Sequence, residues 1–174
     1  MNNSEKCCAV KCELQLNETY WNNQYLNNQT GWDLGEVSPP IKSYIDQISN
    51  KNIRILIPGS GNSYEAEYLL KQGFTNISVI DIAPALVDKL KNKFSTLPEI
   101  KIILGDFFEL DGVYDLIIEQ TFFCALNPSL RNKYVAKMNE LLERNGLLVG
   151  LLFDRTFEHQ GPPFGGSKNE YLSL

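Results

Sequence analysis

An apolar run that ends in two glycines constrains this chain more than any other feature. The run 53–57 leads into Pro58-Gly59-Ser60-Gly61, and Val79-Ile80-Asp81 is a second apolar run that ends in a carboxylate. A buried strand that turns into a helix at Gly-x-Gly lets backbone amides approach a ligand, because no Cβ is in the way. Asp81 would lie at the tip of the neighbouring strand, where it can accept hydrogen bonds from both hydroxyls of a ribose. The sequence therefore predicts a nucleoside-cofactor site.

Strands and helices alternate along most of the chain. Short apolar runs, typical of buried strands, alternate with stretches whose apolar residues recur at helical spacing. This alternation favours an α/β fold with a doubly wound, mostly parallel sheet that is covered by helices on both faces. The predicted strands are 53–57, 77–81, 101–104, 114–119 and 147–153, and the predicted helices between them are 63–72, 84–94 and 129–143.

The first 52 residues lack this alternation. We expect 1–16 to be a poorly ordered tail, followed by one domain over 17–174. Within that domain, 17–52 holds two short helices and 53–174 forms the α/β core. The second helix begins at Ser38-Pro39-Pro40, which offers a capping hydroxyl and prolines for the first turn.

Composition limits the class of protein and its partners. A chain of 174 residues, 43% hydrophobic and 21% charged, is sized for one globular domain. Its net charge of −5 argues against a nucleic-acid partner. Because we find no run of about 18 apolar residues and no signal-peptide pattern, we expect no membrane partner and a cytoplasmic location. Cys7, Cys8, Cys12 and Cys124 lack zinc-site spacing, so we expect free thiols and no metal.

Tyr64 bears on which cofactor the glycines hold. A dinucleotide fingerprint has a third glycine at this position, which allows close packing under a pyrophosphate, and the bulk of Tyr64 argues against that ligand. A methyltransferase cofactor carries a carboxylate and a sulfonium in place of two phosphates, and its adenine is read by a polar residue after the third strand. Asp106 stands there and can accept from the adenine amino group, with Phe107 along the ring. Taken alone, Asp106 can equally cap a turn.

Several further motifs occur in one order with these residues. Together they resemble the thiopurine S-methyltransferase family, and most of all its bacterial and plant branch of thiol and halide methyltransferases. The likeness runs from about Tyr20 to the C-terminus. It rests on Trp21, Trp32-Asp33-x-Gly35, Pro58-Gly59-Ser60-Gly61, Val79-Ile80-Asp81-Ile82, Gly105-Asp106-Phe107-Phe108, Thr121-Phe122-Phe123-Cys124-Ala125-Leu126-Asn127-Pro128 and Gly161-Pro162-Pro163-Phe164.

The resemblance implies a class I, Rossmann-like methyltransferase fold in which 17–52 forms a helical lid over S-adenosylmethionine, with S-adenosylhomocysteine as the product. The lid tryptophans would lie near the methionine end of the cofactor, Asp81 would hold the ribose, and Asp106 would hold the adenine. The cofactor-binding residues that it implies are Trp21, Tyr25, Trp32, Gly59, Ser60, Gly61, Asp81, Ile82, Asp106, Phe107 and Glu119.

The acceptor side is less defined. Phe122, Phe123 and Phe153 either line the acceptor pocket or pack in the core, and Arg155 either attracts an anionic acceptor or is a solvated surface charge. His159 is the only histidine, and it is either a proton acceptor or a surface residue. A thiolate or halide arrives already anionic, so methyl transfer to it requires no strong base.

We therefore predict an S-adenosylmethionine-dependent methyltransferase that acts on a small soft nucleophile, such as a thiol, a thiopurine-like compound or a halide-type anion, and we expect it to be monomeric. Two alternatives stay open at this point: a cofactor-binding module without catalysis, and a nicotinamide-dependent oxidoreductase. The family's chains continue through a closing strand pair, whereas this sequence ends at Leu174. We therefore expect a sheet that lacks its last strands and has an exposed edge.

Overall fold

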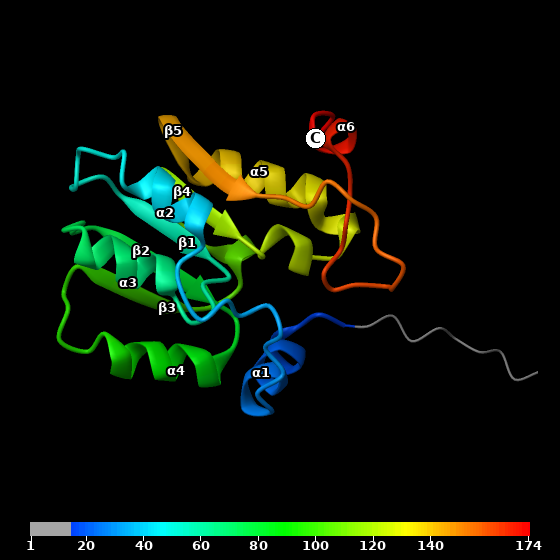
Figure 1. Ribbon diagram of the computed structural model, residues 1–174, viewed down its shortest axis with the longest axis horizontal. Helices are drawn as coiled ribbons and strands as arrows, with labels where there is room; N and C mark the ends of the chain where they lie inside the picture. The colour runs from blue at the N-terminus through cyan, green and yellow to red at the C-terminus, as the bar shows by residue number, and fades with distance from the viewer. Residues whose placement is uncertain (1–14) are drawn as a thin grey trace, which may run out of the picture.

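The computed structural model describes residues 15–174 (Figure 1). Cys7, Cys8, Cys12 and nearly all of the predicted tail 1–16 lie outside the described residues. In chain order the elements are α1 (Glu18–Leu26), α2 (Pro39–Ile45), β1 (Ile55–Pro58), α3 (Tyr64–Lys71), β2 (Ile77–Asp81), α4 (Pro84–Lys93), β3 (Ile100–Leu104), η1 (Phe107–Glu109), β4 (Tyr114–Gln120), η2 (Phe123–Ala125), η3 (Pro128–Leu130), α5 (Arg131–Leu141), β5 (Leu142–Leu151) and α6 (Lys168–Tyr171), where η marks a 3-10 helix.

The five strands form one parallel sheet in the order β3-β2-β1-β4-β5. The chain lays down β1 at the centre, adds β2 and β3 on one side, and then returns to add β4 and β5 on the other. This confirms the predicted doubly wound α/β fold. Because the winding reverses between β1 and β4, the carboxyl ends of these strands lie at the topological switch point, where folds of this kind bind their ligands.

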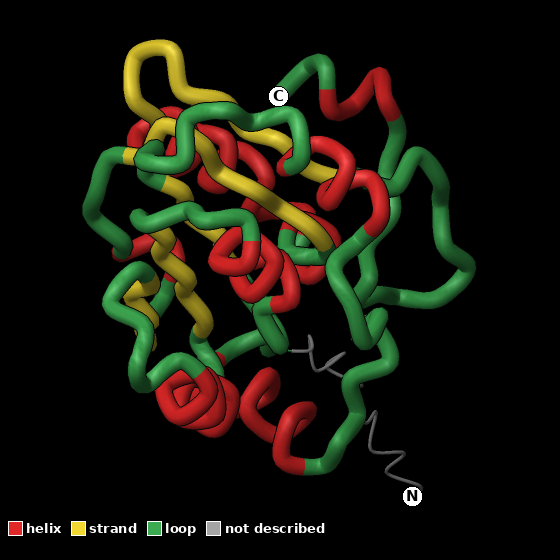
Figure 2. The backbone as a smooth tube through the Cα atoms, turned by 60° about the vertical axis from the view of Figure 1, so that its left-hand side comes forward, coloured by secondary structure: helices red, strands yellow, loops and turns green. Residues whose placement is uncertain are grey.

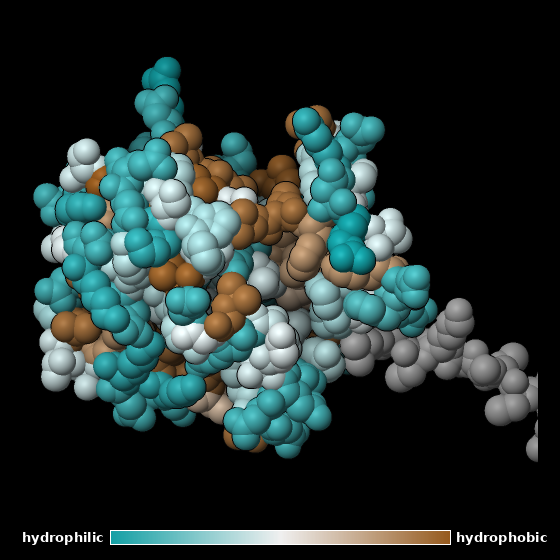
Figure 3. Space-filling model, viewed as in Figure 1, coloured by the Kyte–Doolittle hydropathy of each residue, from teal (hydrophilic) through white to brown (hydrophobic). Residues whose placement is uncertain are grey.

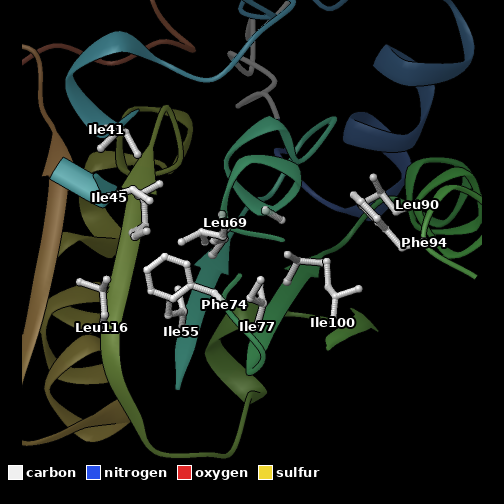
Figure 4. Packing of buried hydrophobic residues seen from close by; sticks show 14 of the residues in the cluster. Ile41, Ile45, Ile55, Leu69, Phe74, Ile77, Leu90, Phe94, Ile100 and Leu116 are labelled. Carbon is white, nitrogen blue, oxygen red and sulfur yellow. The ribbon is translucent and has the colours of Figure 1, made fainter. Parts of the chain in front are cut away.

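Residues that alternate along each strand divide the core between the two faces of the sheet. On one face, Ile55 of β1 and Ile77 of β2 pack with residues of α2, α3 and α4, among them Leu69 of α3 (Figure 4). On the other face, Leu56 of β1 packs with η1, η2 and α5, which contributes Met138. All four residues of β1 and all five of β2 are buried, so the centre of the sheet is covered on both sides.

The boundary between the last predicted helix, 129–143, and the last predicted strand, 147–153, differs from the structure. α5 ends at Leu141, and β5 begins directly at Leu142. Tyr114 pairs with Leu142 but Leu116 pairs with Leu147, so a bulge in β5 holds the extra residues. A Cβ at Gly146 would lie 2.9 Å from the carbonyl oxygen of Tyr114, so this bulge depends on glycine.

β5 forms one edge of the sheet and is largely exposed. Leu147, Leu148 and Leu151 are 57%, 42% and 42% exposed. Apolar surface is visible in Figure 3 between the body of the molecule and the C-terminal segment, in the region where Figure 1 places β5. The expected exposed sheet edge is therefore present in the structure.

The helix α1 lies against α4 at the lower edge of the molecule (Figures 1 and 2). The side chain of Asn17 caps α1 by accepting a hydrogen bond from the amide of Tyr20. The Asn22 side chain accepts a 2.8 Å hydrogen bond from the amide of Ala85, in the first turn of α4. Because α1 has no buried residue of its own, such contacts with the core hold it in place.

The segment that follows β5 returns along the surface to α6. Arg131, at the start of α5, is only 5% exposed; it forms an ion pair with Glu170 and donates a 2.6 Å hydrogen bond to the carbonyl oxygen of Gly165. Its guanidinium lies over the rings of Phe123 and Tyr171. Arg131 therefore anchors the C-terminal segment to the body. In the part of the chain that the structure describes, no helix combines the length and apolarity that a membrane crossing needs.

Candidate cofactor site

The loop after β1 has the backbone shape that its glycines predict. Gly59 and Gly61 adopt φ values of 56° and 49°, in the left-handed region that favours glycine. A Cβ at Gly59 would lie 2.3 Å from the Phe122 ring, whereas a Cβ at Gly61 would meet only the Tyr25 hydroxyl, at 3.8 Å. The first glycine thus makes room for a protein side chain, and the second leaves the loop open toward the lid.

Asp81 lies beside this loop at the end of β2. Its Oδ1 accepts a 3.0 Å hydrogen bond from the amide of Ala83, and its Oδ2 accepts one of 3.4 Å from the amide of Gly61. The side chain is 8% exposed, and burial raises the pKa of its carboxyl to about 6 despite these amide donors. Ile82 follows, half-buried. A buried carboxylate with so few donors is suited to accept hydrogen bonds from ligand hydroxyls.

The aromatic residues of the predicted lid form one cluster. The Trp21 and Trp32 rings meet edge to face with centroids 5.6 Å apart, and the Tyr25 and Trp32 rings do so at 6.0 Å. Burial, followed by the nearby charge of Asp81, raises the pKa of the Tyr25 hydroxyl. The structure therefore brings all three aromatic residues into one cluster beside the glycine loop.

A cavity of about 60 Å³ opens between this lid and the glycine loop. Two of its lining residues carry buried polar atoms, Ser60 Oγ and Gln120 Oε1, for which the described residues provide no hydrogen-bond partner. A third, Thr121, has a φ of 61°, which is unusual and costly for a β-branched residue. The lining residues are Trp32, Asp33, Leu34, Glu36, Gly59, Ser60, Gly61, Asn62, Ser63, Tyr64, Glu65, Gln120 and Thr121.

These observations test whether the residues fit a nucleoside cofactor with an amino-acid end. The unpartnered oxygens of Ser60 and Gln120 are available to polar groups of a ligand, and strain of the Thr121 type is commonly found at binding sites. The open backbone at Gly61 permits close approach. The residues therefore fit such a cofactor.

Of the two residues predicted to bind adenine, Asp106 is exposed and Phe107 is buried. Asp106 is exposed at the end of β3, and its Oδ1 accepts a 2.9 Å hydrogen bond from the amide of Phe108, so it does cap a turn. Phe107 is only 4% exposed and packs against Phe122 and Tyr134 in the core. The Phe107 ring is therefore part of the core, and its place along the adenine stays a prediction.

Glu119 is almost wholly buried at the end of β4. Its Oε1 accepts hydrogen bonds of 2.8 and 2.9 Å from the amides of Phe122 and Phe123, which fixes the turn into η2. Burial raises the pKa of the Glu119 carboxyl to about 7. Glu119 therefore shapes the loop that carries Phe122 over Gly59.

The predicted acceptor residues are not all brought together. Phe122 is half-buried over the glycine loop, but Phe123 is 3% exposed and packs on Tyr134, as a core residue. Phe153 and Arg155 are exposed in the segment after β5, where each contacts Phe157. Of the two alternatives left open for Phe123, its burial and its contact with Tyr134 favour packing in the core.

His159 is exposed in the same segment. Its ring stacks on that of Phe157, with centroids 5.3 Å apart and planes at 19°. The cavity beside the glycine loop does not include His159 among its lining residues. The geometry therefore favours the surface alternative for this residue.

Sequence reasoning missed several residues of the cavity. Asp33 of the lid loop accepts hydrogen bonds from Asn62 and Tyr64, and Gln120 and Thr121 close the wall at the end of β4. Two signals were available: Asp33 lies inside the motif Trp32-Asp33-x-Gly35, and Gln120 and Thr121 directly follow a predicted strand at the ligand-binding edge of the sheet.

Solved structures place this architecture among methyltransferases that use S-adenosylmethionine. The magnesium protoporphyrin IX methyltransferase of Synechocystis, solved with bound S-adenosylhomocysteine, superposes with a TM-score of 0.69 at 14% identity over 88% of this chain and 82% of its own. The 1,6-didemethyltoxoflavin-N1-methyltransferase of Burkholderia thailandensis gives a TM-score of 0.66 at 18% identity, over 79% of this chain and 61% of its own. At these identities the likeness defines the class I methyltransferase fold.

Sequence comparison identifies the family within this class. The family model of thiopurine S-methyltransferase (TPMT) matches residues 16–174. Probable thiol methyltransferase 2 of Arabidopsis thaliana is 33% identical over 156 residues, which cover 87% of this chain and 69% of that protein. Thiopurine S-methyltransferase of Acinetobacter baylyi is 26% identical, over 91% and 83% of the two chains. The chain belongs to the thiopurine S-methyltransferase family, and it is an S-methyltransferase with S-adenosylmethionine as its cofactor.

Proposed function

We propose that the methyl acceptor is a small soft nucleophile: a thiol, a thiopurine-like compound or a halide-type anion. The observation that carries this proposal is the aromatic cluster of Trp21, Tyr25 and Trp32 against the glycine loop, in a chain whose relatives are named for thiols, thiocyanate and thiopurines. Aromatic faces stabilise a neighbouring cation by roughly 0.5–2 kcal/mol and exclude water, which suits a sulfonium centre.

In this proposal the cofactor lies along the carboxyl ends of β1, β2 and β3. Asp81 accepts hydrogen bonds from the ribose hydroxyls and Asp106 from the adenine amino group, beside the backbone of Ile82 and Phe107. Ser60 Oγ and Gln120 Oε1, the two unpartnered oxygens in the wall of the cavity, bind polar groups at the amino-acid end. Gly59, Gly61 and Glu119 act by shaping the loops around it.

S-adenosylmethionine supplies an electrophilic methyl group and a neutral thioether leaving group. The chain's own residues orient it and exclude water, and such positioning can lower a barrier by roughly 7–11 kcal/mol in well-oriented systems. Because a thiolate or halide is already anionic, no side chain has to remove a proton during transfer. The residues around the acceptor are Phe122, over Gly59, together with Phe153 and Arg155 of the segment after β5.

A radiolabelled-methyl assay over a panel of thiols, thiopurines and halides tests this proposal. We expect transfer to at least one soft nucleophile and none to matched alcohols or amines. Transfer only to the oxygen or nitrogen compounds would contradict it. Tight binding of S-adenosylhomocysteine in calorimetry without any transfer would instead support the cofactor-binding module without catalysis.

We also propose that the chain works as a monomer in the cytoplasm, without a nucleic-acid partner. The buried Cys124 is a free thiol, which suits a reducing compartment. Light scattering at several concentrations tests the monomer, and a dimer mass throughout would contradict it.

A further inference from the structure

Asp33 connects the lid to the cofactor loop. It lies in the loop between α1 and α2, directly after Trp32, and its Oδ1 accepts a 2.8 Å hydrogen bond from the amide of Gly35. Its Oδ2 accepts hydrogen bonds from the Asn62 side chain and, at 3.3 Å, from the Tyr64 hydroxyl. One carboxylate thus fixes the turn of the lid loop and ties that loop to the segment after β1.

The two partners of Asp33 are themselves held by α4. The side-chain oxygen of Asn62 accepts a 2.8 Å hydrogen bond from the Lys89 ammonium of α4. The backbone carbonyl of Asn62 accepts one of 3.3 Å from the Lys93 ammonium of the same helix. Tyr64 begins α3, and the Lys93 ammonium lies 5.5 Å from the centre of its ring. Asp33 therefore joins the lid to the start of α3 and, through Asn62, to α4.

Tyr64 contacts the lid loop, which its position in the glycine motif did not suggest. It occupies the place of the third glycine in a dinucleotide fingerprint, where its bulk argues against a pyrophosphate. In the structure its hydroxyl reaches across to the lid loop. Burial, and then the hydrogen bond to Asp33, raise the pKa of this hydroxyl, so it stays protonated and remains a donor.

This tie lies at the wall of the cofactor cavity. Trp32, Asp33, Asn62 and Tyr64 all line the cavity, together with the buried and unpartnered Ser60 Oγ. A lid loop that detaches from the glycine loop would therefore open the wall of this cavity on the side of Trp32.

We propose, on the basis of the function proposed above, that Asp33 is a positioning residue that latches the lid through Asn62 and Tyr64, holds Trp32 beside the glycine loop, and so sets how long the cofactor stays bound. Asp33 acts through Trp32 and takes no part in methyl transfer itself. The latch should therefore control cofactor release and turnover more than acceptor affinity.

The same helix offers a matched control. Tyr68, one turn after Tyr64 on α3, donates a hydrogen bond to Asp46, and neither residue lines the cavity. Tyr68→Phe therefore removes the same type of tyrosine–aspartate contact from the same helix. The chain has only two tryptophans, Trp21 and Trp32, and both belong to the lid, so intrinsic fluorescence reports on the latch directly.

The experiment measures S-adenosylhomocysteine release by stopped-flow tryptophan fluorescence in the full chain. We expect Asp33→Asn and Tyr64→Phe each to raise the release rate by about five- to tenfold, and Tyr68→Phe to change it less than twofold. The double variant of Asp33 and Tyr64 should be no faster than the faster single variant, because the contact that Tyr64→Phe removes is already lost when Asp33 no longer latches the lid. In turnover assays kcat and the KM for S-adenosylmethionine should change, with the KM for the acceptor within twofold.

Three outcomes would overturn the latch. The first is a release rate within twofold of the wild type in both Asp33→Asn and Tyr64→Phe. The second is an effect of Tyr68→Phe on the release rate as large as theirs, because all three side chains would then be merely structural. Multiplying effects in the double variant would show that Asp33 and Tyr64 act separately. If the wild type binds no S-adenosylhomocysteine, the proposed function fails together with the latch, whereas binding with unaltered release in the variants removes the latch alone.

Discussion

The half of the sheet proposed to bind the cofactor and the half proposed to bind the acceptor differ in how their residues are held. On the cofactor side, β1 and β2 are buried along their whole length, and Asp81 is fixed by amides from its own and the neighbouring loop. On the acceptor side, β5 is mostly exposed, and Phe153, Arg155 and His159 lie in an exposed segment beyond it. The first side is held by backbone geometry close in sequence, and the second by a few long-range side-chain contacts.

Substitutions should therefore have different effects on the two sides. Changes on the cofactor side should alter both folding and cofactor affinity, because the same buried backbone serves both. Changes on the acceptor side should leave cofactor affinity alone.

We expect Gly59→Ala to have the largest effect. A methyl group there would meet the Phe122 ring at 2.3 Å, and the φ of 56° is strained for alanine. Overpacking costs roughly 1–3 kcal/mol and the left-handed backbone roughly 1–2 kcal/mol. Because 1 kcal/mol shifts Tm by roughly 2–4 °C in a chain of this size, we expect a loss of about 5–15 °C in calorimetry.

Gly73→Ala is the control for Gly59→Ala. Gly73 has a φ of 85°, but an added Cβ would meet no atom within 4 Å, so the variant carries only the backbone strain. Its Tm should fall by about half as much or less. Equal losses in the two variants would show that the close approach of Phe122 contributes nothing.

Asp81→Ala comes second and tests the cofactor side directly. Hydrogen bonds to a charged group contribute roughly 1.5–3 kcal/mol each, so the Kd for S-adenosylhomocysteine should rise by about a hundredfold or more in calorimetry. Asp88→Ala, which removes an exposed carboxylate from α4, should leave it unchanged. An unaltered Kd in Asp81→Ala would remove the ribose role from Asp81.

Sequence reasoning worked best where a local pattern decides the structure. The strand that ends at Gly59-Ser60-Gly61 and the one that ends at Asp81 are correctly predicted because buried runs and glycine turns are local signals. The burial of Phe107 and Phe123 could not be predicted, because sequence gives a residue's place along the chain but not the direction of its side chain. Both rings are core residues here.

The latch of the lid and the anchor of the C-terminal segment were out of reach for another reason. Asp33 meets a partner 31 positions away and Arg131 one 39 positions away. Such contacts depend on how the elements pack, which no local spacing reveals. The boundary of β5 was missed likewise, since the bulge opposite Tyr114 is set by pairing with β4.

Arg131→Met comes third and addresses the acceptor side. It removes the ion pair with Glu170, the hydrogen bond to Gly165 and the contacts with the Phe123 and Tyr171 rings. We expect a stability loss of about 1–3 kcal/mol in urea unfolding and faster proteolysis of 152–171. The Kd for S-adenosylhomocysteine should stay within twofold. A tenfold weaker cofactor affinity would break the division between the two sides.

The pH dependence of cofactor binding comes fourth. Because burial raises the pKa of free Asp81 to about 6, this carboxyl is mostly protonated at pH 5 and ionised at pH 7. Ribose hydroxyls donate to the ionised form, so affinity for S-adenosylhomocysteine should rise by about tenfold from pH 5 to pH 7 and then level off. By the same linkage, this group lowers the stability of the free protein as pH rises from about 4 to 6.

Calorimetry at pH 5, 6, 7 and 8 measures this dependence, with Asp81→Asn as its control. The variant should bind more weakly but lose the rise between pH 5 and 7 that belongs to Asp81. Glu119, with a pKa of about 7, stays in place in both proteins and contributes equally. An identical pH profile in the two proteins would assign the titration to Glu119 instead.

His159→Gln should have the smallest effect. The imidazole is exposed and stacks on Phe157, and the cavity is lined by other residues. Since a soft anionic acceptor needs no proton removed, kcat/KM should change less than twofold at every pH between 6 and 9. A fall of tenfold or more would make His159 a proton acceptor. The acceptor would then be a neutral thiol that loses its proton to His159 as the methyl group is transferred.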